Sequence, residues 1–256
     1  MSSDGNNKTD APGSTKTPYW QDTTDRFVGF FDLLGFKNFV FRNEHATVKK
    51  RMESLNQILT EIRQNEEVTL SKPGFTGSPK DHQDIDNVAV RPIIFSDSIL
   101  LVSSDSSAAS ANKLLAVSGW LISRCMIRGI AMKGALAFGQ QTADFDRSLY
   151  FGQPLIDAYE LQDEFLAYGA ILHCSMEQFA RKCDLNQYFK FLEPFDVPLK
   201  GGIVKHQLVD WTHPLTKREC ALQHVESFYD SVSGTARKYV DNTASYTRHL
   251  MSRQQT

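Results

Sequence analysis

The chain has 256 residues, of which 41% are hydrophobic and 23% charged, and its formal net charge is −2. A chain of this length buries a substantial core as one large domain, or as one domain with additions. The small net charge gives no reason to expect bulk binding to nucleic acid or to a membrane surface. No apolar run reaches the length of a membrane span. The four cysteines include no CxxC pair, and a cytoplasmic, reduced protein is predicted.

The chain begins with MSSDGNNKTDAPGSTKTP, which is small and polar and has no apolar signal-peptide core. This composition predicts a disordered tail over residues 1–22. An apolar and aromatic run from Arg26 to Phe31 then predicts a buried strand. Apolar residues that recur every three or four positions predict a single helix over about 38–65. A stretch rich in Pro, Gly, Ser and Asp at 70–86 predicts a surface loop.

Two apolar stretches, residues 87–95 and 99–102, flank the dipeptide SD and predict a tight hairpin. A helix is expected to follow, from a Ser or Asp cap to about Met126, and then a strand over 128–138. The remaining expected elements are a strand at 148–152, a helix at 153–165, a strand at 169–175, a helix at 176–183, strand character at 201–211, and helices at about 216–233 and 234–251.

The order strand, helix, hairpin, helix, strand is typical of an α+β fold. It predicts a ferredoxin-like βαββαβ core in which helices cover a mostly antiparallel sheet. We expect this core over residues 23–165. Residues 166–256 are expected to supply the remainder of the sheet and a C-terminal helical extension.

Two aspartates interrupt apolar strands. Asp32 follows VGFF at the end of the first strand, and Asp97 stands inside RPIIFSDSILLVS at the hairpin tip. Either one alone is compatible with an ordinary turn or cap. If the first strand and the hairpin are neighbours, however, the two carboxylates lie side by side, where they repel and favour a divalent cation. Magnesium suits such a site, because it takes one or two carboxylates and completes its shell with water and phosphate oxygens.

The segment LLGF, which follows Asp32, leads into a helix. Backbone N–H groups at such a position can point at an anion, and Gly35 lets the backbone approach closely. A glycine before a helix is frequent, so this pattern alone indicates a phosphate site only weakly.

Four stretches, FFDLLGF, IIFSDSI, IRGIAMKGAL and YFGQPLIDAYELQ, occur in this order. Together they resemble class III nucleotidyl cyclases, and more closely the bacterial pyrimidine cyclases of the Pycsar anti-phage systems. The resemblance covers roughly Phe27 to Leu161. The chain beyond it carries no further motif and is expected to be a family-specific extension.

The resemblance implies that Asp32 and Asp97 bind two Mg²⁺ or Mn²⁺ ions per active site, with the carbonyl oxygen of Leu33 as a further ligand. One ion would lower the pKa of the ribose 3′-hydroxyl, and the other would hold the triphosphate and help pyrophosphate leave. The expected triphosphate cradle is the backbone of Leu33, Leu34, Gly35 and Phe36.

Two cations, Arg128 and Lys133, are the candidates for stabilising charge on the phosphates. Five residues apart on a regular strand, they would face opposite sides unless the glycines bulge it. The alternative for each is that its side chain is exposed to solvent or pairs with an acidic residue at the surface. The Asn and Arg that adenylate and guanylate cyclases usually carry would fall near Ile156 and Glu160, and neither is present. This departure favours the pyrimidine branch, and it means that a transition-state arginine comes from elsewhere or is absent.

Three residues are candidate readers of the base. Arg91 lies six residues before Asp97, close to where purine cyclases place a base-reading lysine, and it can donate to O2 or O4 of uracil. A surface charge on an edge strand is the alternative for Arg91. Asp157 and Tyr159 are the other two candidates, with a core position as the alternative for Tyr159.

The resulting hypothesis is a uridylate cyclase that converts UTP to 3′,5′-cyclic UMP and pyrophosphate. The product would be a second messenger that activates a separate effector in anti-phage defence. CTP is the alternative substrate. A purine cyclase of the same fold and a non-catalytic nucleotide-binding dimer module are the other hypotheses. A head-to-tail homodimer with two shared sites follows by analogy, with no nucleic-acid or membrane partner.

Overall fold

The computed structural model describes residues 20–64, 89–183, 185, 195–212, 214–215 and 217–252. Most of the tail expected over residues 1–22 and all of the loop expected at 70–86 lie outside the described residues. Trp20 is described, and its indole N–H donates to the carbonyl oxygen of Ala143 at 2.8 Å. Within the described ranges, none of the helices has the length and apolar character that crossing a membrane requires.

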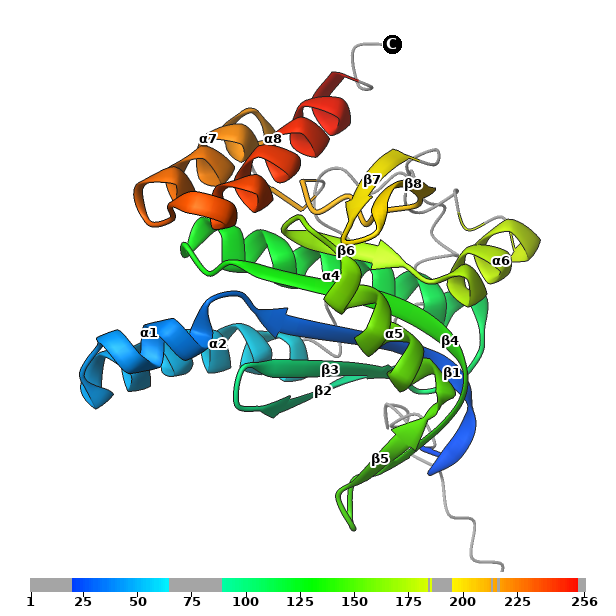
Figure 1. Ribbon diagram of the computed structural model, residues 1–256. Helices are drawn as coiled ribbons and strands as arrows, with labels where there is room; N and C mark the ends of the chain where they lie inside the picture. Colours follow the sequence, from blue (N-terminus) through cyan, green and yellow to red (C-terminus); the bar gives the residue numbers. More distant parts are fainter. Residues whose placement is uncertain are drawn as a thin grey trace, which may run out of the picture.

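The centre of the fold is a six-stranded sheet (Figure 1). β1 (Thr23–Leu33) pairs with β3 (Ser98–Ser103) on one side and with β4 (Met132–Asp144) on the other, both antiparallel. β2 (Val90–Phe95) pairs with β3 and closes that side of the sheet. The resulting order β4-β1-β3-β2, with helices between β1 and β2 and between β3 and β4, confirms the predicted βαββαβ core.

Two short strands extend the same edge of β4. β5 (Leu149–Gly152) pairs antiparallel with the end of β4, at Gln141–Asp144. β6 (Gly169–Leu172) pairs parallel with its beginning, at Lys133–Leu136. Because β4–β6 is the one parallel pairing among the described strands, the sheet is mixed and mostly antiparallel, as predicted.

Helices cover both faces of the sheet (Figure 1). α2 (His45–Gln64) and α4 (Ala108–Ile127) pack behind it in this view, and α5 (Gln153–Glu164) crosses β1 and β4 in front. α4 begins at Ser107, whose hydroxyl accepts a hydrogen bond from the N–H of Ser110 at 3.1 Å. The main core lies between the sheet and the α2–α4 layer, where it shields β1 from solvent on that side.

The C-terminal third packs onto the same core. Its elements are α6 (Cys174–Cys183), β7 (Phe195–Leu199), β8 (Gly202–His206), the 3-10 turns η2 (Arg218–Cys220), η3 (Ser227–Asp230) and η4 (Gly234–Ala236), and the helices α7 (Ala221–Glu226) and α8 (Arg237–Ser252). β7 and β8 form a separate antiparallel hairpin. Val240 and Ala244 of α8 are buried in the main core, so the extension shares one hydrophobic core with the sheet.

The prediction of a single helix over 38–65 is wrong. The chain forms α1 (Phe36–Arg42), leaves helical geometry at Asn43, where φ is −125° and ψ is 151°, and starts α2 at His45. The Asn43 side-chain amide donates to the carbonyl oxygen of Phe39 at 2.8 Å. This local side-chain bond takes the place of a helical backbone bond and ends α1.

The predicted strand over 128–138 begins too early, because β4 starts only at Met132 and residues 128–131 form the cap of α4 and a turn. Arg128 caps that helix with its backbone N–H, and Gly129 adopts a left-handed conformation with φ of 64°. A glycine in this conformation ends a helix without the steric penalty of a side chain. The predicted helix at 216–233 is likewise shorter, since only α7 is α-helical and 3-10 turns flank it.

We expect Gly134→Ala to destabilise the fold by about 1–3 kcal/mol. A Cβ at Gly134 would clash with the ring of Phe31 and would lie 2.6 Å from the carbonyl oxygen of Phe30. Urea denaturation followed by circular dichroism measures the change. Gly201→Ala is the matched control, because a Cβ there meets nothing within 4 Å, and it should leave the midpoint unchanged. Equal midpoints for the two variants would contradict this account of the packing.

Candidate active site

The end of β1 and the tip of the β2–β3 hairpin lie together. Asp32 pairs with Ser98 in the β1–β3 register, and the N–H of Leu33 donates to the carbonyl oxygen of Asp97 at 3.0 Å. The predicted proximity of the first strand and the hairpin is therefore confirmed. The tip is a two-residue turn in which Ser96 has a positive φ of 55°. This turn fixes the backbone of Asp97 against the end of β1.

Asp32 is in an unfavourable environment for its negative charge. Burial, and after it the charge of Asp97, raise its pKa from 3.8 to about 6, while the charge of Lys133 opposes this shift. Both carboxylates are partly accessible to solvent. Among the described residues, no group of three or more His, Cys, Asp or Glu side chains forms a metal cluster. A pair of carboxylates with an open side fits a hard cation such as Mg²⁺ or Mn²⁺, which also binds water and phosphate oxygens.

Lys133 faces Asp32 across the β1–β4 ladder, where the two residues are direct partners. Its side chain is only 4% exposed, and burial lowers its pKa. The ammonium group donates to the carbonyl oxygens of Asp163 at 3.0 Å and Phe165 at 3.4 Å. Lys133 therefore caps the C-terminus of α5, where a positive charge is favourable. The structure places this predicted cation beside Asp32 and occupies its donors with α5 carbonyl groups.

An ion pair that the sequence did not predict lies next to Lys133. Nζ of Lys200, in the turn between β7 and β8, lies 2.5 Å from Oδ2 of Asp163. This bond lowers the pKa of Asp163, whose negative charge in turn contributes to the raised pKa of Asp32. The partners are 37 positions apart. No spacing rule connects residues so distant, so nothing in the sequence pointed to this pair.

The predicted phosphate cradle is partly occupied by bonds within the protein. The N–H of Leu33 donates to Asp97, and the N–H of Leu34 donates to the carbonyl oxygen of Ala131 at 2.9 Å. Gly35 follows with a left-handed φ of 77° and precedes the first residue of α1, Phe36. The N–H groups of Gly35 and Phe36 are thus the ones left to meet a ligand in this turn.

Arg128 and Arg91 are held elsewhere. Arg128 stands at the end of α4, not on a strand with Lys133 as predicted, and its guanidinium lies 3.7 Å from Glu61. The guanidinium of Arg91 lies 4.5 Å from the ring centre of Trp20, with a second aromatic ring, that of Phe145, at 5.1 Å. Arg91 lies near the start of β2, at the far end of the hairpin from the Asp97 tip.

The α5 candidates lie on the face of the sheet that carries Asp32. Asp157 accepts a hydrogen bond from Gln153 at 2.7 Å and lies 3.7 Å from Nδ1 of His173. Tyr159 is 54% exposed and contacts the ring of Phe30 edge-on, with ring centres 5.4 Å apart. Tyr159 is therefore not in the core, which was the alternative expected for it from the sequence.

No protein-family model and no curated protein matches the chain. Solved structures are similar to it at low identity. The guanylate cyclase domain of RhGC from Catenaria anguillulae in complex with GTP has a TM-score of 0.46 and 16% identity over 72% of this chain and 96% of that one. The adenylyl cyclase CyaB from P. aeruginosa has 0.43 and 16%, covering 74% and 97%. A class III adenylyl cyclase-like ATP-binding protein from Pseudomonas aeruginosa has 0.41 and 16%, covering 78% and 40%.

We expect Asp32→Asn to stabilise the metal-free protein at neutral pH. Because the folded-state pKa of Asp32 is raised from 3.8 to about 6, this group stabilises the fold below pH 3.8, and that contribution is lost as the pH rises through about 6. With a discount for solvent screening of this half-buried carboxyl, the variant should gain about 1 kcal/mol at neutral pH in EDTA. The gain should vanish near pH 4, and urea titrations at both pH values measure it. A gain that is independent of pH would contradict the assignment.

We expect Lys133→Met to destabilise the protein by about 1–3 kcal/mol, because it leaves the carbonyl groups of Asp163 and Phe165 at the end of α5 without this donor. Lys200→Met is the control, since that ammonium is exposed on the β7–β8 turn. The control should change stability much less, because solvent screens an exposed ion pair. Thermal unfolding of both variants tests this, and a control as damaging as Lys133→Met would refute the capping role.

Proposed function

We propose that this chain is a nucleotidyl cyclase that acts on a nucleoside triphosphate. The carrying observation is the pair Asp32 and Asp97, two carboxylates brought together at the end of a buried central strand, one of them with a pKa near 6. Two divalent cations bound there would lower the pKa of the ribose 3′-hydroxyl and hold the triphosphate.

In the proposed reaction the 3′-oxygen forms a bond to the α-phosphorus. The bond from that phosphorus to the bridging oxygen of pyrophosphate breaks, and the 3′-hydroxyl proton passes to solvent. Asp32, Asp97 and the carbonyl oxygen of Leu33 are the proposed ligands of the cations. The N–H groups of Gly35 and Phe36 are proposed to meet the phosphates, because they lie three and four positions after Asp32, where the turn enters α1.

We propose UTP as the substrate, cyclic UMP as the product and CTP as the alternative substrate. The residues near the usual Asn and Arg positions of purine cyclases support this choice. Ile156, which is 50% exposed, and Glu160 both lie at the surface of α5. Neither side chain carries an amide or a guanidinium. A cyclic pyrimidine nucleotide of this kind would act as a second messenger for a separate effector in anti-phage defence.

We also propose that two copies assemble through the Asp32 face of the sheet. Large apolar side chains are exposed on this side, among them Phe95 beside the hairpin tip, 83% exposed, and Tyr159 on α5. Phe95 alternates with Ile94, which packs against the main core, so it points to the opposite face, as Asp32 does. Exposed apolar patches of this kind mark interaction surfaces. A second copy would cover them and could supply the missing transition-state cation.

We expect the purified protein, incubated with Mn²⁺ and one of ATP, GTP, CTP or UTP at a time, to yield cyclic UMP from UTP, as identified by mass spectrometry. Asp32→Ala and Asp97→Ala should each lower the rate more than about a thousandfold, or about 4 kcal/mol in the barrier. Asp196→Ala is the control, because that carboxylate pairs with Lys205 on the exposed β7–β8 hairpin.

Cyclic CMP would keep the mechanism and correct the base. Cyclic AMP or GMP would place the chain with purine cyclases. Full activity in either active-site variant, or no product from any nucleotide in a folded dimer, would refute the proposed chemistry.

A further inference from the structure

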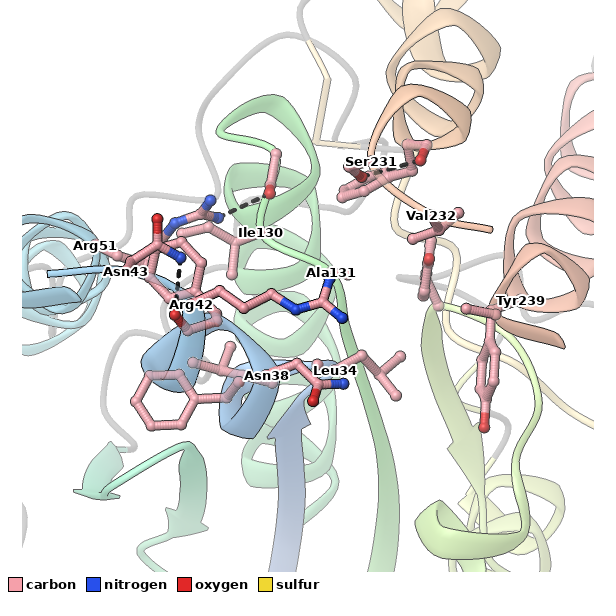
Figure 2. A pocket seen from close by; sticks show the side chains of 18 of the residues that line it. Leu34, Asn38, Arg42, Asn43, Arg51, Ile130, Ala131, Ser231, Val232 and Tyr239 are labelled. Carbon is pink, nitrogen blue, oxygen red and sulfur yellow. Dashed lines mark hydrogen bonds between the residues drawn. The ribbon is translucent and has the colours of Figure 1, made fainter. Parts of the chain in front are cut away.

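A cavity of about 510 Å³ lies against the turn between β1 and α1 (Figure 2). One wall comes from the turn and from α1, with Leu34, Asn38 and Arg42. The facing wall comes from the C-terminal extension, including Ser231 and Tyr239. The cavity volume lies in the range of small-molecule sites.

The carboxylate pair itself does not line this cavity. Neither Asp32 nor Asp97 lines it, whereas Leu33, Gly35 and Phe36 of the turn proposed to hold the phosphates do. Successive side chains of a strand point to opposite faces, so Asp32 faces α5 while Leu33 faces the cavity side. A ligand in the cavity would therefore contact the turn from behind the proposed metal site.

The charges around the cavity are all positive. Arg42 and Arg51 line it, and no described lining residue carries a carboxylate. One donor of Arg51 is already in use, because its guanidinium donates a hydrogen bond to the carbonyl oxygen of Gly129 at 2.8 Å. In the described part of the chain, the side chain of Arg42 has neither an ion pair nor a hydrogen bond, and Figure 2 shows it reaching across the cavity towards Ala131. An anion at this guanidinium would gain charge-assisted hydrogen bonds.

The far end of the cavity is aromatic. The rings of Tyr168 and Tyr239 are stacked with their planes 14° apart and their centres 6.2 Å apart, and Phe228 contacts Tyr168 at 5.0 Å. All three residues line the cavity. Tyr168 and Phe228 are only 2% and 5% exposed, so a planar group would stack on, or meet edge-on, chiefly the half-buried ring of Tyr239.

We propose that this cavity binds a nucleoside monophosphate, with the phosphate on Arg42 and the base against the Tyr168–Tyr239–Phe228 end. Binding needs no metal, although the cavity shares Gly35 and Phe36 with the turn proposed to meet the substrate phosphates. Its effect on the enzyme rests on the proposed function: Leu33 and Leu34 line the cavity, and their N–H groups donate to Asp97 and Ala131. The nucleotide would thus act as an effector that shifts the turn carrying the catalytic pair.

The test is isothermal titration calorimetry of the full chain in EDTA with AMP, UMP and inorganic phosphate. We expect at least one of the two nucleotides to bind with a dissociation constant below about 1 mM, and phosphate to bind more weakly. Arg42→Ala should weaken nucleotide binding by about 10- to 100-fold. Ala236→Trp, which fills the cavity from an exposed position, should abolish it. Lys37→Ala is the control on the same helix, because Lys37 is exposed and does not line the cavity.

The double variant Asp32→Asn/Asp97→Asn separates this proposal from the proposed chemistry. Nucleotide binding should survive in it although turnover is lost. The proposal is overturned if neither nucleotide binds the wild type, if Arg42→Ala binds as tightly as the wild type, or if the double variant no longer binds. An inactive enzyme that still binds nucleotide through Arg42 would contradict only the proposed catalysis.

Discussion

The position of Asp32 depends on a central strand that is hydrogen-bonded along both edges. β1 pairs with β3 and β4 up to its last residues, so Asp32 is held between Ser98 on one side and Lys133 on the other. A side chain on a frayed or edge strand could move away from a second carboxylate. Asp32 is held in place, and burial together with the nearby charge of Asp97 raises its pKa. A cation bound at the pair would offset the repulsion between the two carboxylates, so cation binding is favoured there.

The same position links the Asp32 face of the sheet to the C-terminal part of the chain. Lys133 connects the strand beside Asp32 to the end of α5, and Lys200 connects Asp163 at that end to the β7–β8 hairpin. The charges alternate along this series, with negative Asp32 followed by a cation, an anion and a second cation. The extension therefore contributes to the electrostatics of a site whose motifs all lie in the first two thirds of the chain.

Much of the architecture was predictable because it rests on local patterns. Alternating and continuous apolar runs located β1, the hairpin and α4, and their order determined the βαββαβ core. The proximity of Asp32 and Asp97 followed from that order. The break at Asn43 was missed, because the apolar periodicity hides a single side-chain hydrogen bond to Phe39. The start of β4 was misplaced because RGIAM is apolar enough to resemble a strand, whereas the left-handed Gly129 lies in the turn that ends α4.

The partners of the charged candidates were not predictable. Arg128 is opposite Glu61, Lys133 binds carbonyl groups of α5, and Arg91 packs on Trp20. Each contact joins segments that are distant in the sequence, so it depends on the packed structure and not on spacing. Residue type alone identified these cations as candidates, but only the fold shows which donors are already occupied.

The two N–H groups that donate at the end of β1 also determine how α1 can move. The backbone N–H of Leu34 is hydrogen-bonded to Ala131. The next residue, Gly35, has a left-handed backbone conformation, and no heavy atom beyond its own and those of its two neighbours lies within 4 Å of where its Cβ would be. Beyond it, α1 has no fully buried residue, and it is held by the packing of Phe36 on the main core and by the guanidinium of Arg51 over the ring of Phe39. Its seven residues form a lever about 10 Å long, and a turn of about 10° at Gly35 displaces the Arg42 end by about 2 Å. A rotation of α1 would therefore pivot at Gly35, in the turn that follows Asp32.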